Sequence, residues 1–121
     1  MQPPLSRLVL YTKRMDAMAM FYETHFGYRT VRRADVRIVE LVPPGSGIHL
    51  MLHPAGKGTR EGQVGIKLVF DVSDVAAFCA QARERGLEFG PIHAADGYAF
   101  SNAKDPSKNT ISVSSRAFAG R

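Results

Sequence analysis

The chain has 121 residues, 45% of them hydrophobic and 22% charged, which is the size and composition of one ordinary globular domain. Its formal net charge is +5, but the basic residues are scattered and lack the interleaved aromatic residues that favour nucleic-acid binding. No apolar run approaches the about 20 residues that a membrane span needs. The sequence therefore predicts neither a nucleic-acid partner nor a membrane partner.

Cysteine usage bears on the compartment. The single cysteine, Cys79, excludes an internal disulfide, and the first residues lack the apolar region of a signal peptide. Free thiols persist in the reducing cytoplasm. We therefore expect a cytoplasmic protein.

The first elements of the chain are a strand and a helix. The segment Leu5–Thr12 is rich in branched and aromatic residues and predicts a strand, with Arg7 and Tyr11 on the same face. Apolar residues at helical spacing then predict a helix over Met15–Phe26. Gly27 suits the left-handed conformation that ends many helices.

Three more strands are expected in the first half, over Tyr28–Arg33, Val36–Val42 and Ile48–His53. A short turn around Ala34–Asp35 joins the first two. The third strand places His49 and Met51 on one face, because side chains alternate along a strand. The glycine-rich and charged stretch Pro54–Gln63 reads as a linker between two halves.

The second half of the chain repeats the first. With an offset of 60 residues, Leu8 falls on Leu68 and Ala17 falls on Ala77. A strand over Val64–Val72 leads into a second helix, which ends at a glycine as the first helix does. Such self-similarity indicates a duplicated half-domain, because the period is too long and the copies too few for a solenoid.

The second helix has its own start and stop signals. Ser73 or Asp74 caps it, and Gly86 ends it. Three strands follow, over Leu87–His93, Gly97–Asn102 and Asn109–Ser114.

The order of elements is thus βαβββ twice, which predicts an α+β protein with curved mixed sheets. We expect a single domain over residues 1–121, with repeat halves at 5–53 and 64–115 and a linker at 54–63. One face of the sheets packs under the helices. The other face is free to curl round a ligand.

Three segments carry a resemblance to a known family. FYETHFGY matches an F-Y-x-x-x-L/F-G-F/Y pattern at the end of a first helix, and VFDVSDVAAFCAQARERGLEF matches a strand, a V-x-D-V motif and a helix ending in glycine. KDPSKNTISV matches a closing D-P-D-G-N-x-I-E-L turn and strand. Over about residues 5–115 the chain resembles the vicinal oxygen chelate superfamily, which has the glyoxalase/bleomycin resistance/dioxygenase fold. Lys108 stands where this pattern has glycine, so we expect about 1 kcal/mol of backbone strain there.

The resemblance also implies where a divalent metal ion would be bound in the enzymes of the superfamily. Those positions, on the first and fourth strands of each half, fall on Arg7, His49, Lys67 and Ser112. Only His49 is a good metal ligand, because the cationic Arg and Lys side chains repel a divalent ion. We therefore predict that the usual metal site is absent and that the protein uses no metal or other cofactor.

These replacements favour a small anionic ligand. Arg7 and Lys67 are equivalent under the repeat, and a cleft with two cations attracts a carboxylate or phosphate. The predicted ligand-binding residues are Arg7, Tyr11, His49, Met51, Lys67 and Ser112. The alternative is that the two cations pair with Glu40 or Asp71 and bind no ligand.

The resemblance to this superfamily implies a small-molecule binding protein of the glyoxalase/bleomycin-resistance type. One alternative is a metal-dependent lyase or dioxygenase-type enzyme of the same superfamily, whose catalytic residues the sequence does not identify. Another is a dimeric structural or interaction module. We expect a homodimer in each case, because a module this small leaves edge strands and one sheet face open and because similar families usually dimerise.

Overall fold

The computed structural model describes residues 2, 4–34 and 36–119, and it divides into two compact units, Met1–Glu61 and Gly62–Arg121. Asp35, in one of the predicted turns, lies outside the described residues. None of the helices in the described part of the chain has the length and apolar character needed to cross a membrane.

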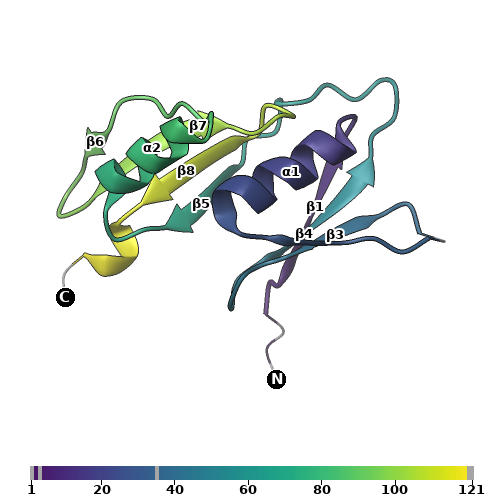
Figure 1. The fold of residues 1–121 in the computed structure, drawn as a ribbon, viewed down its shortest axis with the longest axis horizontal. Helices are drawn as coiled ribbons and strands as arrows, with labels where there is room; N and C mark the ends of the chain where they lie inside the picture. The colour runs from purple at the N-terminus through teal and green to yellow at the C-terminus, as the bar shows by residue number, and fades with distance from the viewer. Residues whose placement is uncertain (1, 3, 35, 120–121) are drawn as a thin grey trace. The chain divides into compact units, whose positions relative to one another are not determined.

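The first unit is one helix on one four-stranded sheet (Figure 1). Its elements in chain order are β1 (Arg7–Thr12), α1 (Met15–Phe26), β2 (Arg29–Val31), β3 (Val39–Val42) and β4 (His49–Pro54). The strand order across the sheet is β1-β4-β3-β2. β1 is parallel to β4, whereas the other two neighbouring pairs are antiparallel.

The second unit has the same architecture. Its elements are β5 (Lys67–Asp71), α2 (Val75–Glu84), β6 (His93–Ala94), β7 (Ala99–Lys104), β8 (Thr110–Ser114) and a final 3-10 turn, η1 (Arg116–Phe118). The strand order is β5-β8-β7-β6, again with only the first pair parallel. The expected α+β class, with two βαβββ repeats and mixed sheets, is confirmed.

The core of the first unit lies between α1 and one face of its sheet. On the helix, Met18 and Tyr22 are completely buried, as their helical spacing predicts. On the sheet, alternate residues such as Leu50 and Leu52 point under the helix. Gly27 ends α1 at φ 70°, where its N–H donates to the carbonyl oxygen of Glu23.

The core of the second unit lies under α2. Ile111 and Val113 of the central strand β8 are completely buried, and Val75 of α2 is 4% exposed. Asp74 caps the helix, because its side chain accepts a hydrogen bond from the N–H of Ala77 at 3.0 Å. The predicted cap and the predicted helix are therefore confirmed.

One predicted strand is wrong. Of the segment Leu87–His93 only the last residue belongs to a strand, β6. Leu87 and Phe89 are buried by packing rather than by pairing, and Phe89 meets the ring of Phe78 edge-on at 6.1 Å. Pro91 follows, and because proline has no N–H it cannot continue a ladder.

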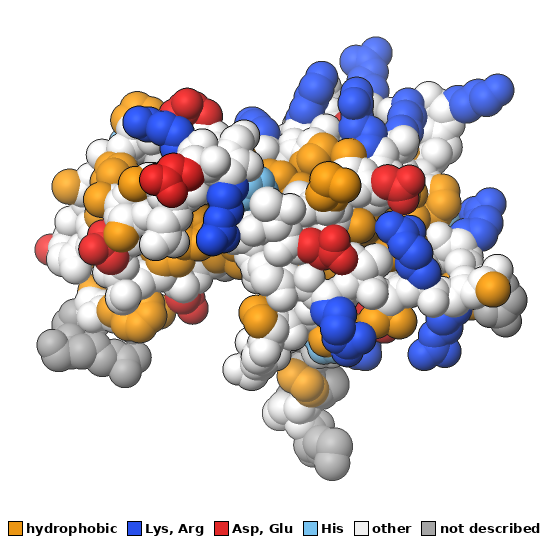
Figure 2. Space-filling view, viewed as in Figure 1, with side chains coloured by type: hydrophobic (Ala, Val, Ile, Leu, Met, Phe, Trp, Pro, Cys, Tyr) orange, Lys and Arg blue, Asp and Glu red, His pale blue; other side chains and the backbone are white. Residues whose placement is uncertain are grey.

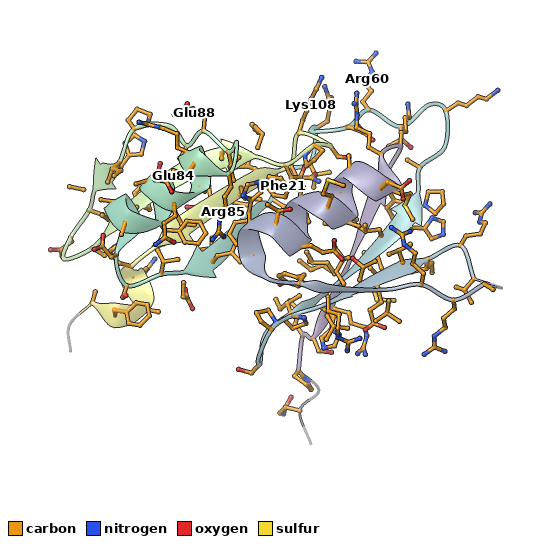
Figure 3. The ribbon with its side chains drawn as sticks, in the orientation of Figure 1. Phe21, Arg60, Glu84, Arg85, Glu88 and Lys108 are labelled. Carbon is orange, nitrogen blue, oxygen red and sulfur yellow. The ribbon has the colours of Figure 1, made fainter. Side chains whose placement is uncertain are left out.

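The turn between β7 and β8 is built on a buried carboxylate. Asp105 is 3% exposed and accepts hydrogen bonds from the N–H groups of Ser107 and Asn109, each at 2.9 Å. Lys108 has φ 68°, so the expected left-handed conformation at this non-glycine residue is confirmed. Its side chain points outward from the turn (Figure 3).

Candidate functional site

The face of the first sheet opposite α1 carries four of the six predicted ligand-binding residues. The parallel register of β1 and β4 sets Arg7 beside His49 and Tyr11 beside His53, with Met51 between the two histidines. These residues share a face because side chains alternate along each strand. We name this surface the β1/β4 face and define it by Arg7, Val9, Tyr11, Glu40, His49, Met51 and His53.

Three charged or polar side chains meet on the β1/β4 face. Nδ1 of His49 donates a hydrogen bond to Oε2 of Glu40 at 2.8 Å. The guanidinium of Arg7 approaches the same oxygen at 3.7 Å, so the ion pair between Arg7 and Glu40 that the sequence offered as an alternative is present. Within the described residues the Arg7 guanidinium makes no hydrogen bond, and its side chain is 56% exposed.

Glu40 was not among the predicted site residues. It lies on β3 directly opposite Met51 of β4, which places it on the β1/β4 face. Its signal in the sequence is the alternation of β3, in which Val39 and Leu41 are apolar and buried and Glu40 is not. That alternation predicts that Glu40 lies on the face opposite α1, but it does not predict that Glu40 accepts a hydrogen bond from His49.

The other end of the β1/β4 face is aromatic. The rings of Tyr11 and His53 lie 5.0 Å apart between centroids. Nδ1 of His53 lies 2.9 Å from the carbonyl oxygen of Pro54 and donates to it. Tyr11 is 58% exposed and Val9 is 49% exposed, so this face offers apolar surface as well as charge.

The remaining two predicted residues lie on the second sheet, on the face opposite α2. There Val69 of β5 and Asn102 of β7 flank Ser112 of β8. Ser112 is 2% exposed, and its hydroxyl donates to the carbonyl oxygen of Ser101 at 3.2 Å. Ser112 is therefore a buried polar residue at the base of this face, and its hydroxyl hydrogen is already used in a hydrogen bond.

Lys67 has a different partner from the one expected. It makes no ion pair with Asp71 or with any other residue that the structure describes. Its ammonium instead lies over the ring of Phe100, 5.4 Å from the centroid. Such a contact between a cation and the face of an aromatic ring is attractive.

The residues at the superfamily's metal positions do not fit a divalent ion. Arg7 and Lys67 are cations, and Ser112 already donates its hydroxyl hydrogen. Of these four residues, His49 alone keeps a good ligand atom, Nε2, because its Nδ1 donates to Glu40, and one ligand does not make a divalent metal site. In residues 2, 4–34 and 36–119, no group of three or more His, Cys, Asp and Glu residues could hold a metal ion.

Cys79 is not arranged as a nucleophile. It is half-buried on α2, and burial raises the pKa of its thiol more than Ser101 and Arg83 lower it. A raised pKa leaves less of the reactive thiolate at neutral pH.

Basic side chains on the visible surface are mixed with side chains of other kinds. On the face shown in Figure 2, several Lys and Arg side chains stand together along the upper edge, and others are spread over the first unit with hydrophobic and acidic side chains between them. Charged side chains of both signs are typical of a solvated surface.

Comparison with known proteins agrees with the fold. The model of the Glyoxalase/Bleomycin resistance protein/Dioxygenase superfamily matches residues 5–113. No curated protein is significantly similar in sequence.

Several solved structures are similar. UcmS2 is 17% identical over 95% of this chain and 99% of that chain, with a TM-score of 0.78. TnmS3, an antibiotic binding protein from Streptomyces sp. CB03234, is 19% identical over 93% and 94%, with a TM-score of 0.76. Virulence protein STM3117 from Salmonella typhimurium is 18% identical over 94% and 97%, with a TM-score of 0.72. At these identities the likeness shows the fold alone.

Proposed function

Since the chain belongs to the Glyoxalase/Bleomycin resistance protein/Dioxygenase superfamily, we propose that it is a small-molecule binding protein that needs no bound metal and prefers a ligand with an anionic group. The observation that carries this proposal is the exposed guanidinium of Arg7 on the open β1/β4 face. One structural neighbour, TnmS3, is described as an antibiotic binding protein, which supports binding of a small organic molecule.

The hydrogen-bond donors of Arg7 are available to bind an anionic ligand. Its separation of 3.7 Å from Glu40 exceeds hydrogen-bond length, so its N–H groups remain available. A guanidinium offers paired donors that match a carboxylate or a phosphate in bidentate geometry. Glu40 stays hydrogen-bonded to His49 when Arg7 turns to a ligand, so its carboxylate is not left without a donor.

The neighbours of Arg7 supply contact area. Tyr11 and Val9 are largely exposed, and Met51 lies between the two histidines of β4. Burying such apolar surface against a ligand yields roughly 25 cal/mol per Å². Lys67 and Ser112 remain part of the proposal, on the face of their own sheet opposite α2. Lys67 supplies a second cation there, and Ser112 is a buried polar residue.

The proposal also covers location and assembly. We place the protein in the cytoplasm, on the basis of its single cysteine. We propose that it is a homodimer, because each four-stranded sheet ends in two edge strands that a second copy can cover. Sedimentation of a monomer at micromolar concentration would contradict the dimer.

The experiment that tests the function is a binding titration on metal-free protein. The protein is dialysed against a chelator and screened by thermal shift with carboxylates and phosphates. Affinity for any hit is then measured for wild type, for Arg7→Ala, and for Arg60→Ala as a control that removes the same charge from an exposed loop. Arg7→Ala should weaken binding by about 1.5–3 kcal/mol, the range for a hydrogen bond to a charged group.

Two outcomes oppose the proposal. Equal affinity in wild type and Arg7→Ala would remove Arg7 from the site. Binding that appears only after Fe, Mn, Ni or Zn is restored would show that the protein needs a metal.

A further inference from the structure

Aromatic and basic side chains form a continuous row on the second unit. The ammonium of Lys67 lies 5.4 Å from the centroid of the Phe100 ring. Phe100 in turn lies 5.1 Å from the ring of His93 and 6.3 Å from the ring of Tyr98. The guanidinium carbon of Arg116 lies 5.6 Å from the centroid of Tyr98. We name these five residues the aromatic row.

The aromatic row is not evident in the sequence, because four of its members come from four different elements and Tyr98 lies just before β7. Lys67 is the first residue of β5, His93 begins β6, and Arg116 begins η1. Sheet pairing brings His93 and Phe100 together in the register of β6 and β7, and the side chains of Lys67 and Arg116 reach the rings of Phe100 and Tyr98.

The aromatic row is accessible from solvent. Lys67 and His93 are exposed, and Phe100 and Tyr98 are half-buried. The apolar core of this unit, with Ile111 and Val113, lies on the opposite face under α2. The row is therefore additional to the core, and its rings are not needed to fill the space beneath the helix.

The geometry of the two cations sets the kind of ligand. The ring planes of His93 and Tyr98 are tilted by 35° and 36° from the plane of the Phe100 ring. The three ring faces therefore have similar orientations, which suits the stacking of a further flat ring. Each cation is held by a ring and, within the described residues, by no carboxylate. A cation held only in this way keeps its hydrogen-bond donors for an incoming anion.

From this arrangement we infer that the aromatic row is a binding site for a planar aromatic compound that carries a carboxylate or another anionic group. The ring of the ligand stacks against Phe100 and His93, and its anionic group accepts hydrogen bonds from the ammonium of Lys67. This inference rests on the proposed small-molecule binding and deepens it by naming a ligand class. It shares Lys67 with that proposal but uses none of the residues of the β1/β4 face.

A small aromatic anion fits the row better than a single-stranded nucleic acid does. A nucleic-acid groove tracks the backbone with a series of cations. Here the row has two cations, and Asp71 of β5 points to the same side of the sheet as Lys67. The carboxylate would repel a continuous phosphate chain, whereas one anionic group needs only Lys67.

The test uses 2-naphthoate as the probe. Because the chain contains no tryptophan, the fluorescence of the probe can be followed without tryptophan emission. Wild type should bind it saturably, and Phe100→Leu and Lys67→Gln should each weaken binding about fivefold or more. Phe100→Tyr keeps the ring and should retain the affinity. Thermal unfolding of each variant checks that it is folded.

Matched controls remove the same groups elsewhere in the second unit. Phe118→Leu removes an exposed ring, and Lys108→Gln removes an exposed cation. Both should bind the probe within about twofold of wild type, because neither side chain belongs to the aromatic row. The neutral amide of the probe, 2-naphthamide, should bind about fivefold or more weakly than 2-naphthoate because it lacks the charge.

Several results would overturn the inference. They are absence of saturable binding, equal affinity for the amide, unchanged affinity in both Phe100→Leu and Lys67→Gln, and tighter binding of a single-stranded oligonucleotide through these residues.

The outcomes also distinguish binding at the β1/β4 face from binding at the aromatic row. If Arg7→Ala abolishes binding of 2-naphthoate while Phe100→Leu and Lys67→Gln do not, the inference fails and the proposed function stands. The opposite pattern supports the aromatic row and removes Arg7 as the anchor for this probe.

Discussion

Glu40 on β3 and His49 on β4 are joined by a hydrogen bond of 2.8 Å between Oε2 and Nδ1. The same oxygen is also the atom that Arg7 approaches at 3.7 Å. One carboxylate oxygen therefore faces two of the predicted ligand-binding residues, with a hydrogen bond to His49 and an ion pair with Arg7. A ligand anion on this face must compete with Glu40 for Arg7.

We predict that Glu40→Gln strengthens the binding of an anion at the β1/β4 face. Removing the competing charge should improve affinity by up to about fivefold, because a partly exposed ion pair is worth about 0.2–1 kcal/mol. The effect should shrink as salt is raised. The measurement is a titration of wild type and Glu40→Gln with an anionic hit at two ionic strengths.

Glu88→Gln is the control for Glu40→Gln. Glu88 pairs with Arg83 at 3.0 Å on the surface of the second unit, so its loss should leave the titration unchanged. Weaker anion binding in Glu40→Gln would show that Glu40 positions Arg7 for the ligand rather than competing with it.

A second prediction concerns Lys108. Its φ of 68° is a conformation that glycine adopts without cost and that other residues adopt at about 1 kcal/mol or more. Lys108→Gly should raise the free energy of unfolding by about 0.5–1 kcal/mol, because relief of the backbone strain outweighs the cost of the larger entropy that glycine has in the unfolded chain. Urea denaturation measures this change. Lys108→Ala removes the same side chain without relieving the backbone and should be close to neutral; equal stabilisation by both variants would contradict the argument.

Much of the fold could be predicted because it depends on local signals. The helical spacing before Gly27 and the cap at Asp74 fix the two helices, and the 60-residue repeat implies equal topologies for both halves. The segment Leu87–His93 has the composition of a strand, yet Pro91 and tertiary packing decide against it. Local composition does not determine which apolar segments form a ladder.

The candidate site was less predictable for a different reason. Strand parity places Arg7 and His49 on one face correctly. The contacts between side chains on a face depend on how the strands are aligned. The alignment of β3 and β4 brings Glu40 to His49, and the alignment of β6 and β7 brings Phe100 to His93. A one-residue change in register would reverse the face of every side chain in a strand.

A third prediction follows from Tyr28. Burial raises the pKa of its phenol above the ordinary value of 10.0, and its O–H donates to the carbonyl oxygen of Ile48 at 2.9 Å. The folded state therefore holds this proton more tightly than the unfolded state does. Its contribution to stability is complete below about pH 10 and is lost as the pH rises through the folded-state pKa.

Tyr28→Phe tests this contribution. The variant should lose about 1 kcal/mol at neutral pH, where the hydrogen bond is intact. Between wild type and variant, the difference in unfolding free energy should then shrink as the pH is raised above 10, the ordinary value for tyrosine. A difference that stays constant up to the alkaline limit of folding would mean that Tyr28 does not ionise differently in the two states.

The last prediction concerns Gly62, the first residue of the second unit. A Cβ atom built on Gly62 would lie 2.6 Å from Cβ of Lys108 and 2.9 Å from its carbonyl oxygen, and Gly62 itself has φ 79°. Gly62→Ala should therefore lower the free energy of unfolding by about 1–3 kcal/mol, because both the close contact and the left-handed backbone oppose a side chain. Gly58→Ala is the matched control, since a Cβ at Gly58 meets no atom within 4 Å.

The double variant Gly62→Ala/Lys108→Gly separates the two causes. Removing Cβ of Lys108 eliminates the contact at 2.6 Å but leaves the carbonyl contact at 2.9 Å and the φ of residue 62 unchanged. The double variant should thus be less destabilised than the sum of the single changes predicts, by about 0.5 kcal/mol or more, as expected for residues in contact. Strict additivity in urea denaturation would show that Gly62 and Lys108 do not meet in solution.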